Sequence, residues 1–544
     1  MPGLADKSTV YAVFAAAAER FAARTFLRAP AIATRGYADG AIEYSYTSAR
    51  LAVDTLRAGY QALAVAPGDR VALAFDSRLD VYLHLLAVNA LGASIVPLNM
   101  SGSDSELLYL IDHSDTSLIS GAGEHLQRLH ALAGRNGKIP VVSAASLESG
   151  AEPAAPSGGA ETEAALLYTS GTTGRPKGCM LSNAYFLTIG HQYLELGGLC
   201  AIEAGERLLT PLPPNHMNAL CCSFMAMMMC GGCVIQLDRF HPRSWWQTVR
   251  DETATVIHYL GVMPAILLTL EQQADEDFNG QVKFGFGAGS DPRHQQVFEQ
   301  RFGFPLIEAW AMTESGGGAM IVANTEPRMP GQRCIGRPHG PMQLRIVDES
   351  DQDVPQGQQG ELLVRARGRD PRKGFFSGYY KDRMATEEGW RGGWWHTGDM
   401  VRQGADGSLF FVDRRKNVIR RSGENIAAVE VEAALLQHDA VGNCVVTAVP
   451  DEIRGEEVFA FVVTASHVEA SENLARQIFD RSMQSLAYFK APAYIAFVDD
   501  LPLTTSQKVS RAEVKKLARR HVESGQAIDL RAHKARPANT GCIE

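Results

Sequence analysis

The stretch Leu166–Gly178 reads LLYTSGTTGRPKG, a short apolar run that turns abruptly into hydroxyl side chains, glycines and one lysine. A short apolar run of this kind predicts a buried strand. The glycines allow a tight bend after it, because glycine adopts positive φ without steric cost. Successive backbone N–H groups in such a bend bind anions, and Lys177 adds a positive charge. The stretch therefore predicts a buried strand leading into a phosphate-binding loop, rather than a polar linker.

Two other nucleotide-binding motifs do not match the chain. A Walker A loop requires G-x-x-x-x-G-K-[ST], whereas Gly171 and Gly174 are three residues apart and Lys177 follows Pro176. The run GFGAGS (Gly285–Ser290) has serine where the dinucleotide fingerprint has its third glycine. The sequence therefore disfavours a P-loop motor or kinase and a Rossmann oxidoreductase.

Strand-like runs alternate with helical patterns over the first three quarters of the chain. The run RVALAFD (Arg70–Asp76) precedes a helical segment and a second strand, and the runs that begin at Thr255 and Val282 each precede a further helix. This rhythm predicts an α/β fold whose large N-terminal domain contains mostly parallel sheets covered by helices. The pattern predicts a β-rich subdomain from about Gly357 and a small α+β domain from about Asn417.

Composition and charge exclude two classes of partner. The 544 residues include 52 basic and 61 acidic side chains, with no concentrated basic face for nucleic acid. Ala219–Leu237 is uncharged and long enough to span a bilayer. However, Gly231-Gly232 divides it, which predicts a buried helix, a tight turn and a buried strand. Met1–Arg24 lacks the basic region of a signal peptide and predicts an amphipathic helix, so we expect a cytoplasmic protein without a membrane span.

The nine cysteines are scattered along the chain. Cys230 and Cys233 form one CxxC, but no second CxxC or paired histidine completes a zinc site. We therefore expect buried thiols in a reducing compartment.

Further motifs follow the glycine loop in a fixed order. They are EAWAMTES (Glu308–Ser315), GELLVRA (Gly360–Ala366), WWHTGDM (Trp394–Met400), VDRRKNVIRRSGENIAAVEVE (Val412–Glu432) and LPLTTSQKVSR (Leu501–Arg511). Together with YTSGTTGRPKG they resemble, in the same order, the motifs of the adenylate-forming (ANL) superfamily. That superfamily holds acyl-CoA synthetases, peptide-synthetase adenylation domains and firefly luciferase. The resemblance covers nearly the whole chain.

The resemblance implies a domain plan and a reaction. Residues 1–413 would form the adenylation domain, residues 414–417 the hinge, residues 418–523 the small mobile C-terminal domain and residues 524–544 a polar tail. The implied enzyme is an AMP-forming acid–CoA ligase, which converts a carboxylic acid and ATP into an acyl-adenylate and pyrophosphate and then transfers the acyl group to coenzyme A. Because two anions must meet, the protein can supply positive charge and positioning.

The resemblance also implies the nucleotide contacts. The residues that would hold the ATP phosphates are Thr169, Ser170, Gly171, Thr172, Thr173, Gly174 and Lys177. The residues that would lie along the adenine and the acyl pocket are Gly287, Ala288, Gly289, Glu308, Ala309, Trp310, Ala311 and Met312. Trp310 stands where the family usually has tyrosine, and it would stack on adenine or pack in the core. Ala311 replaces the family's usual glycine and would alter the shape of the pocket.

The same motifs imply the catalytic residues, which are Lys508, Thr313, His216 and Lys177. Thr313 would donate to the α-phosphate, and Lys508 would contact the carboxylate and the phosphate together. His216 would gate or position the carboxylate, with an ordinary core histidine as the alternative. Glu314 would hold Mg²⁺, a hard cation that takes carboxylate and phosphate oxygens, with a helix-start acid as the alternative. Gln507 replaces the family's glycine before Lys508.

Ribose and coenzyme A contacts complete the implied site. Asp399 would accept hydrogen bonds from both ribose hydroxyls and Arg414 would contact ribose and phosphate, with a solvated surface pair as the alternative. Lys416 would lie at the hinge. The residues that would line the thiol route are Arg421, Ser422 and Gly423. Arg420 and Arg421 could pair with coenzyme A phosphates or form a solvated edge.

The acid substrate and the acceptor stay open at this point. No aspartate in the acyl-pocket segments would bind an α-amino group, which disfavours an amino-acid adenylation domain. The run RCIGRP (Arg333–Pro338) resembles the carnitine and crotonobetaine branch, whereas the apolar lining would also admit a fatty or aromatic acid. The alternatives to a CoA ligase are an enzyme that passes its adenylate to a carrier protein or to oxygen, and a non-catalytic nucleotide-binding relative. We expect a monomer or a homodimer.

Overall fold

The computed structural model describes residues 6–32, 38–136, 139–147, 152–169, 176–272, 276–421, 424–452, 454–486, 488–503 and 509–534. The chain divides into two compact units. Unit 1 consists of Met1–Arg345, Leu363–Thr397 and Gln403–Phe410, and unit 2 consists of Ile346–Leu362, Gly398–Arg402 and Phe411–Glu544. The chain passes between the units within β16 (Met342–Val347), β17 (Gln359–Ala366), β19 (Trp395–Gln403) and β20 (Leu409–Arg414).

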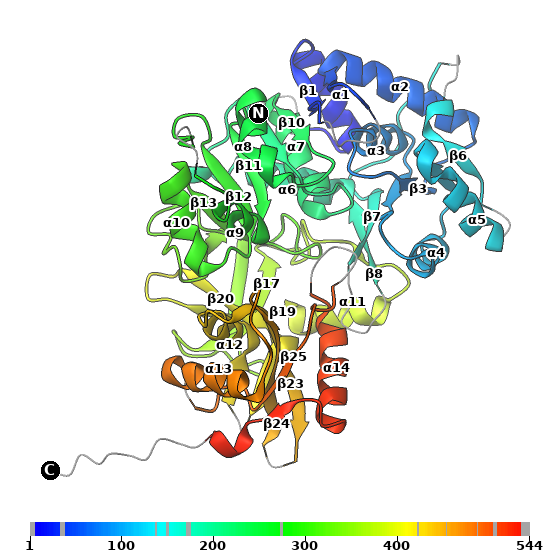
Figure 1. Ribbon diagram of the computed structural model, residues 1–544. Coiled ribbons are helices and arrows are strands. Elements are labelled where there is room, and N and C mark those ends of the chain that lie inside the picture. The colour runs from blue at the N-terminus through cyan, green and yellow to red at the C-terminus, as the bar shows by residue number, and fades with distance from the viewer. Residues whose placement is uncertain are drawn as a thin grey trace. The chain divides into compact units, whose positions relative to one another are not determined.

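Unit 1 contains two sheets with mostly parallel strands (Figure 1). The first has the order β15 (Cys334–His339), β14 (Met320–Val322), β13 (Leu306–Trp310), β12 (Phe284–Ala288), β11 (Val256–Leu260), β9 (Arg207–Thr210), β10 (Cys233–Gln236), β1 (Thr25–Ala29) and β2 (Ile42–Ser45). The second has the order β18 (Gly378–Tyr379), β8 (Lys177–Ser182), β7 (Glu163–Thr169), β4 (Ser94–Pro97), β3 (Arg70–Ala74), β5 (Leu118–Gly121) and β6 (Val141–Ser143). The predicted α/β architecture is therefore confirmed.

Helices cover these sheets and share the core of unit 1 with the strands. They are α1 (Val10–Arg20), α2 (Tyr46–Ala62), α3 (Asp80–Ala90), α4 (Asp104–His113), α5 (Leu126–Asn136), α6 (Asn183–Leu194), α7 (Phe224–Cys230), α8 (Trp245–Asp251), α9 (Val262–Leu268), α10 (Pro292–Phe302) and α11 (Arg383–Gly389). An aromatic cluster holds α8 and α10 together, with the Trp246 ring 4.3 Å from that of Phe302. Burial of such large rings stabilises the layer that carries β11, β12 and β13.

The uncharged segment Ala219–Leu237 folds as the sequence predicts. A π-helical turn (Asn218–Ser223) continues into α7, Gly231 ends the helix at φ 70°, and β10 follows. Every residue of α7 and β10 is buried. Within the described ranges, no helix combines the length and apolarity needed to cross a bilayer. The eight cysteines that the structure describes are all buried and unpaired, and burial raises the pKa of thiols such as Cys222.

From Val418 onward, unit 2 is built on one sheet. Its strands have the order β22 (Glu424–Ala427), β21 (Val418–Arg421), β24 (Gly455–Thr464), β25 (Tyr494–Phe497) and β26 (Ile528–Asp529), and β23 (Val441–Asp451) also pairs with β24. The helices are α12 (Ala428–Leu435), α13 (Glu472–Ser485) and α14 (Arg511–Glu523). This is the small α+β unit that the sequence predicts.

Two details of unit 2 concern the segments that the predicted domain plan names as hinge and tail. The main segment of unit 2 begins at Phe411 and includes the predicted hinge residues 414–417, of which Arg415–Asn417 form a 3₁₀ turn. The predicted polar tail is partly structural, because β26 pairs with β25 and Leu530 is buried at 3 % exposure. An apolar leucine within the polar stretch allows this segment to join the core.

Candidate functional site

The predicted phosphate loop connects two antiparallel strands of unit 1. Thr169 ends β7, Lys177 begins β8, and the two residues lie opposite each other in the ladder. The structure therefore brings together the first and last members of the predicted set. The remaining members, Ser170, Gly171, Thr172, Thr173 and Gly174, lie outside the described residues.

Lys177 lies beside an aromatic ring and an acid. Its Nζ is 4.8 Å from the centre of the Tyr379 ring and 3.4 Å from Asp382 Oδ2. Tyr379 belongs to β18, which pairs with β8 at Cys179. The Lys177 side chain keeps 23 % exposure, so its ammonium group remains accessible to an anion.

Tyr379 also reaches the predicted metal residue. Its hydroxyl donates a 2.7 Å hydrogen bond to Glu314 Oε1, and Glu314 is only 7 % exposed. Burial raises the pKa of Tyr379, and the neighbouring Glu314 raises it further, so the phenol stays a donor at neutral pH. Lys177, Tyr379 and Glu314 therefore form one cluster, although Glu314 and Tyr379 are 65 positions apart in the chain. We call these three residues the Lys177–Glu314 cluster.

Close backbone packing holds the segment that carries Thr313 and Glu314. Tyr185 Oη donates a 2.9 Å hydrogen bond to the Thr313 carbonyl. Gly316 lies against the Tyr185 ring, where a Cβ would come within 2.2 Å of a ring carbon. The Glu314 carbonyl accepts a 3.0 Å hydrogen bond from Phe376 N–H. The glycines that follow Ser315 thus allow α6 to fix the position of Glu314.

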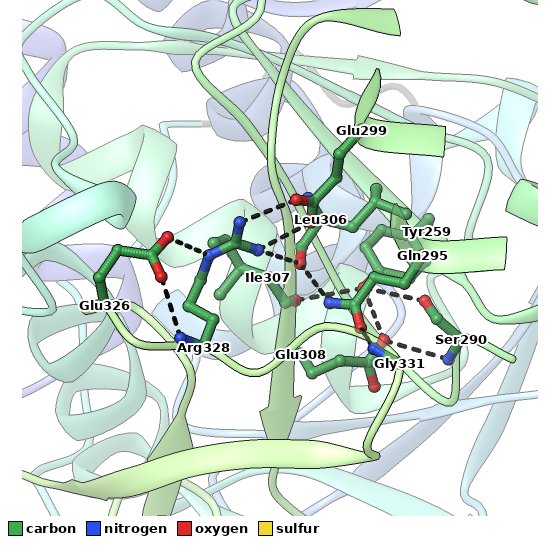
Figure 2. A network of polar contacts seen from close by, with 10 residues as sticks. All are labelled: Tyr259, Ser290, Gln295, Glu299, Leu306, Ile307, Glu308, Glu326, Arg328 and Gly331. Atoms are coloured by element: carbon green, nitrogen blue, oxygen red, sulfur yellow. Dashed lines mark hydrogen bonds and ion pairs between the residues drawn. The ribbon is translucent and has the colours of Figure 1, made fainter. Parts of the chain in front are cut away.

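Glu308 organises the neighbouring turn at the end of β12 (Figure 2). Its carboxylate accepts hydrogen bonds from Gly289 N–H at 2.8 Å and Ser290 N–H at 3.1 Å. Tyr259 Oη donates a third at 2.8 Å. Burial raises the pKa of Glu308, and these hydrogen bonds oppose the shift by stabilising the carboxylate. The Glu308 carboxylate therefore shapes the turn, while Ala288 and Gly289 are exposed to a ligand.

A second group of polar contacts fixes the beginning of β13 (Figure 2). Arg328 donates hydrogen bonds of 2.7 and 2.8 Å to the carboxylate of Glu299. Glu299 Oε1 accepts a 2.9 Å hydrogen bond from Leu306 N–H, and the Leu306 carbonyl accepts from Arg328 at 3.2 Å. β13 is therefore held at its first residue, Leu306, by Glu299 and at its middle residue by the contacts of Glu308.

Four further predicted residues lie at the end of β13 or directly after it, namely Ala309, Trp310, Ala311 and Met312. Ala309 and Trp310 pair with β14, and Trp310 is 6 % exposed, which favours core packing for most of its indole. Met312 Sδ accepts a 3.4 Å hydrogen bond from Trp395 Nε1. Ala311 is half-buried. Gly287 lies opposite Glu308 in the ladder, and a Cβ there would come within 2.3 Å of the Tyr259 carbonyl.

His216 is exposed, so the alternative of a core histidine is wrong. The buried histidine of this region is His258, which the sequence analysis missed. His258 lies on β11, contacts Asn218 Oδ1 at 2.7 Å and Ser223 Oγ at 2.9 Å, and contacts Tyr193 Oη at 2.7 Å through its other ring nitrogen. Burial lowers its pKa to about 3. The neutral imidazole therefore holds the π-helical turn after His216 in place through its contacts with Asn218 and Ser223.

Unit 2 brings the two predicted ribose residues together. Arg414 Nε lies 2.6 Å from Asp399 Oδ1. Asp399 is completely buried whereas the Arg414 side chain is 44 % exposed, so the pair is not the solvated surface pair of the alternative. Glu361 supports this region by accepting from Gly398 N–H at 3.1 Å and pairing with Arg415 at 2.6 Å.

The predicted coenzyme A residues are described only at Arg421. This arginine is buried at 5 % exposure, and its Nε lies 2.5 Å from Glu457 Oε1, so it is not the solvated edge of the alternative. Ser422, Gly423 and the predicted catalytic Lys508 lie outside the described residues. The side chain of Lys416 is also outside the part of the chain that the structure describes.

Comparison with known proteins gives matches over nearly the whole chain. Residues 14–380 match the AMP-binding enzyme family, and residues 430–508 match its C-terminal domain. A sulfoacetate–CoA ligase of Cupriavidus necator is 30 % identical over 491 residues, which cover 87 % of this chain and 92 % of that protein. A crotonobetaine/carnitine–CoA ligase of Salmonella arizonae is 27 % identical, with 87 % and 93 % covered.

Solved structures support the fold. The o-succinylbenzoate–CoA synthetase of Bacillus subtilis, in complex with its acyl-adenylate intermediate, has a TM-score of 0.80 at 23 % identity, with 92 % of this chain and 97 % of that chain covered. The ATP-bound MatB of Rhodopseudomonas palustris has a TM-score of 0.80 at 23 % identity, with 93 % and 98 % covered.

Proposed function

Because the chain belongs to the AMP-binding enzyme family, we propose that it is an AMP-forming acid–CoA ligase. A carboxylate oxygen would attack the α-phosphorus of ATP, the bond to the bridging oxygen would break, and pyrophosphate would leave. The thiol sulfur of coenzyme A would then attack the acyl carbon, the thiol proton would be lost, and AMP would leave. The observation that supports this proposal is the Lys177–Glu314 cluster, in which Lys177 is the last residue of the predicted phosphate loop.

The cluster has the chemistry of a magnesium and phosphate site. The buried carboxylate of Glu314 accepts a hydrogen bond from a neutral phenol, and within the described ranges no lysine or arginine forms an ion pair with it. Its negative charge is therefore available to a hard cation, which fits Mg²⁺. When bound, Mg²⁺ would offset the negative charge of the phosphate oxygens.

Each residue of this site would then have a separate role. Thr169 and Lys177 would hold the phosphates, and Lys177 would offset charge on the leaving pyrophosphate. Tyr379 would keep the carboxylate of Glu314 in place through its hydrogen bond. Thr313 would donate to the α-phosphate. Glu308 would hold the Gly289–Ser290 turn against the adenine rather than contact the nucleotide through its carboxylate.

Other proposed roles rest on the sequence motifs, with Asp399 and Arg414 in unit 2. Asp399 would accept from the ribose hydroxyls, with its carboxylate oriented by Arg414. Lys508 would contact both reacting groups as a cation. In unit 1, His216 is exposed and would position the incoming acid.

The acid is proposed only as a class. The relatives named for sulfoacetate and for crotonobetaine or carnitine favour a small acid that carries a second charged group. A fatty or aromatic acid is the competing class. We further propose a cytoplasmic enzyme that acts as a monomer or homodimer, which size-exclusion chromatography with light scattering would establish.

Pyrophosphate release over an acid panel tests the function. The panel contains sulfoacetate, carnitine, crotonobetaine, octanoate and benzoate, each with ATP and Mg²⁺ and with or without coenzyme A. We expect one acid to give sustained release only with coenzyme A, together with a thioester detected by mass spectrometry. Sustained release without coenzyme A would favour another acceptor, and binding of ATP without release for any acid would favour a non-catalytic relative.

A further inference from the structure

A relay of hydrogen bonds in unit 1 fixes the side chain of Asn218, two positions after the exposed His216. His258 Nδ1 lies 2.7 Å from Asn218 Oδ1, and His258 Nε2 lies 2.7 Å from Tyr193 Oη. His258 and Tyr193 are completely buried, whereas Asn218 is half-buried. The relay therefore leads from the core of unit 1 to a partly accessible amide.

The chemistry of these groups sets the direction of each hydrogen bond in the relay. Burial lowers the pKa of His258 to about 3, so the imidazole is neutral and carries one ring N–H. Because the amide oxygen of Asn218 can only accept, Nδ1 carries this hydrogen and donates it, and Nε2 accepts from the hydroxyl of Tyr193. Ser223 Oγ lies 2.9 Å from His258 Nδ1 and donates to the backbone carbonyl of Asn218 at 3.2 Å. The amide oxygen of Asn218 is therefore held toward the core.

The amide nitrogen of Asn218 is left to bind a ligand. Within the part of unit 1 that the structure describes, Asn218 Nδ2 forms no hydrogen bond, and the described contacts of this side chain all engage its oxygen. Nδ2 carries two N–H donors and no acceptor. It can therefore stabilise an oxygen anion, whereas it offers nothing to a cation.

Asn218 lies at the same edge of its sheet as the turn that the proposed function sets against the adenine. β9, β11 and β12 are adjacent and parallel. His216 and Asn218 follow the carboxyl end of β9, and Gly289 and Ser290 follow that of β12. In open sheets of this kind, ligands bind beyond the carboxyl ends of the parallel strands. The Asn218 amide is therefore at the edge of the sheet where a ligand is expected.

Exposed apolar side chains lie at the same edge. Leu260 ends β11 with 37 % exposure, and Val262 follows it with 61 % exposure. Small-molecule sites combine apolar surface with a few polar groups in fixed orientations. Leu260 and Val262 would contact the carbon skeleton of an acid, and the oriented amide of Asn218 would contact a polar group on it.

We propose that Asn218 is a specificity-determining residue for the acid, whose amide Nδ2 donates to a second anionic group of the substrate and so selects a dianionic acid over a zwitterionic one. The inference rests on the proposed function and deepens it, because it assigns a sign to the second charged group. The relatives named for sulfoacetate and for carnitine differ in this sign, since a sulfonate is an anion and a trimethylammonium group is a cation. Tyr193 and His258 are positioning residues, which orient the amide and do not touch the acid.

Three acids of nearly the same shape separate the effect of charge from that of size. They share a CH₂–COO⁻ unit, and the second group is sulfonate in sulfoacetate, tert-butyl in 3,3-dimethylbutanoate and trimethylammonium in glycine betaine. Each acid is titrated calorimetrically into the full chain saturated with Mg²⁺ and an ATP analogue that has a methylene group between the α- and β-phosphorus atoms. Because this analogue does not release pyrophosphate, the titration measures binding without reaction.

We expect the wild type to bind sulfoacetate at least about tenfold more tightly than 3,3-dimethylbutanoate, which corresponds to one hydrogen bond to a charged group. Glycine betaine should bind most weakly. Asn218→Asp keeps an acceptor for His258 but puts a negative charge in place of the donor, so the order of the three acids should reverse. Tyr193→Phe removes the hydrogen bond that fixes the tautomer of His258, so it should reduce the preference for sulfoacetate and leave the binding of 3,3-dimethylbutanoate unchanged.

Asn443→Asp is the matched control, because it makes the same change at an exposed position of unit 2 and should leave all three dissociation constants unchanged. Should Asn218→Asp fail to fold, Asn218→Ala takes its place. This variant removes the donor without adding charge, so it should bind sulfoacetate and 3,3-dimethylbutanoate equally well.

The outcomes separate this inference from the proposed function. Equal binding of the three acids by the wild type, or binding of none, overturns the role of Asn218, as does an unchanged order in the folded Asn218 variant. Thioester formation by the wild type is measured separately with the acid panel. Thioester formation without a charge preference leaves the proposed function intact, whereas a charge preference that Asn218→Asp reverses, without thioester formation, supports the role of Asn218 and overturns the proposed function.

Discussion

Glu314 of unit 1 and Glu457 of unit 2 are both buried glutamates, yet their partners differ in charge. Glu314 is 7 % exposed and accepts a hydrogen bond from the neutral hydroxyl of Tyr379. Glu457 is 2 % exposed and is paired with both Arg421 and Lys534. The negative charge of Glu457 is offset within the protein, whereas that of Glu314 is available to a ligand.

This comparison distinguishes two uses of a buried carboxylate. A carboxylate that is held by neutral donors keeps its charge and its orientation, and it can bind a metal ion. A carboxylate between two cations joins separate segments of the chain. Glu308 is a third case, because backbone N–H groups and a phenol engage both of its oxygens and leave it to shape a turn.

The largest expected effect is on Glu314. Glu314→Gln keeps an acceptor for Tyr379 but removes the charge, so ATP–pyrophosphate exchange should fall at least about 100-fold. The unfolding midpoint should change little, because the shape and the hydrogen bond are retained. Glu457→Gln in parallel should retain most of the exchange activity. Comparable exchange in Glu314→Gln and wild type would refute the ligand role of Glu314.

The second effect is on stability. Glu457→Gln leaves Arg421 and Lys534 buried beside a neutral amide, so we expect a loss of about 3–5 kcal/mol from the free energy of unfolding of unit 2. Urea denaturation followed by intrinsic fluorescence and circular dichroism measures this loss. Glu314→Gln is the matched control, and an equal shift in the two variants would remove the distinction between the glutamates.

The third prediction concerns pH and a neutral buried group of unit 1. The folded-state pKa of His258 is lowered to about 3, below the ordinary value of 6.5. Because the unfolded chain binds the proton more readily, the contribution of His258 to stability is complete above pH 6.5 and is lost as the pH falls toward 3. At pH 4.5 the loss is roughly 3 kcal/mol. His258→Gln should show a smaller fall in unfolding free energy between pH 7 and 4.5, and an identical slope would contradict this account.

The smallest effect is on the phenol that connects Lys177 with Glu314. Tyr379→Phe keeps the ring beside Lys177 but removes the donor to Glu314, so we expect about a tenfold loss of exchange activity, equal to roughly 1.4 kcal/mol. A higher Mg²⁺ concentration should restore part of this loss. Full activity at every Mg²⁺ concentration would mean that the hydrogen bond has no role in holding Glu314.

Short stretches of sequence predicted those helices and strands whose formation depends mainly on neighbouring residues. The apolar run before Thr169, the divided segment Ala219–Leu237 and the alternating strands and helices all predicted elements that the structure contains. The sequence motifs also predicted roles for Glu314, Asp399 and Arg414; the structure buries Glu314 and pairs Asp399 with Arg414. These features depend on neighbouring residues or on a recognised motif.

Long-range pairing was not predictable in the same way. Tyr379 meets Glu314 across 65 positions, and Lys534 meets Glu457 across 77. No periodic pattern specifies which side chains meet when strands from distant segments pair, so the sequence analysis missed Tyr379, His258 and Lys534. The strand β26 (Ile528–Asp529) within the predicted polar tail was not foreseen for the same reason, because it pairs with the distant β25.

The central claim is that Glu314 supplies the charge that holds Mg²⁺ at the phosphate end of the site. Isothermal titration of ATP into wild type and Glu314→Gln, each with and without Mg²⁺, tests it most directly. We predict that Mg²⁺ tightens ATP binding to the wild type at least about tenfold and leaves the variant nearly unchanged, while binding without Mg²⁺ is similar in the two proteins. The same Mg²⁺-dependent gain in the variant would contradict the account.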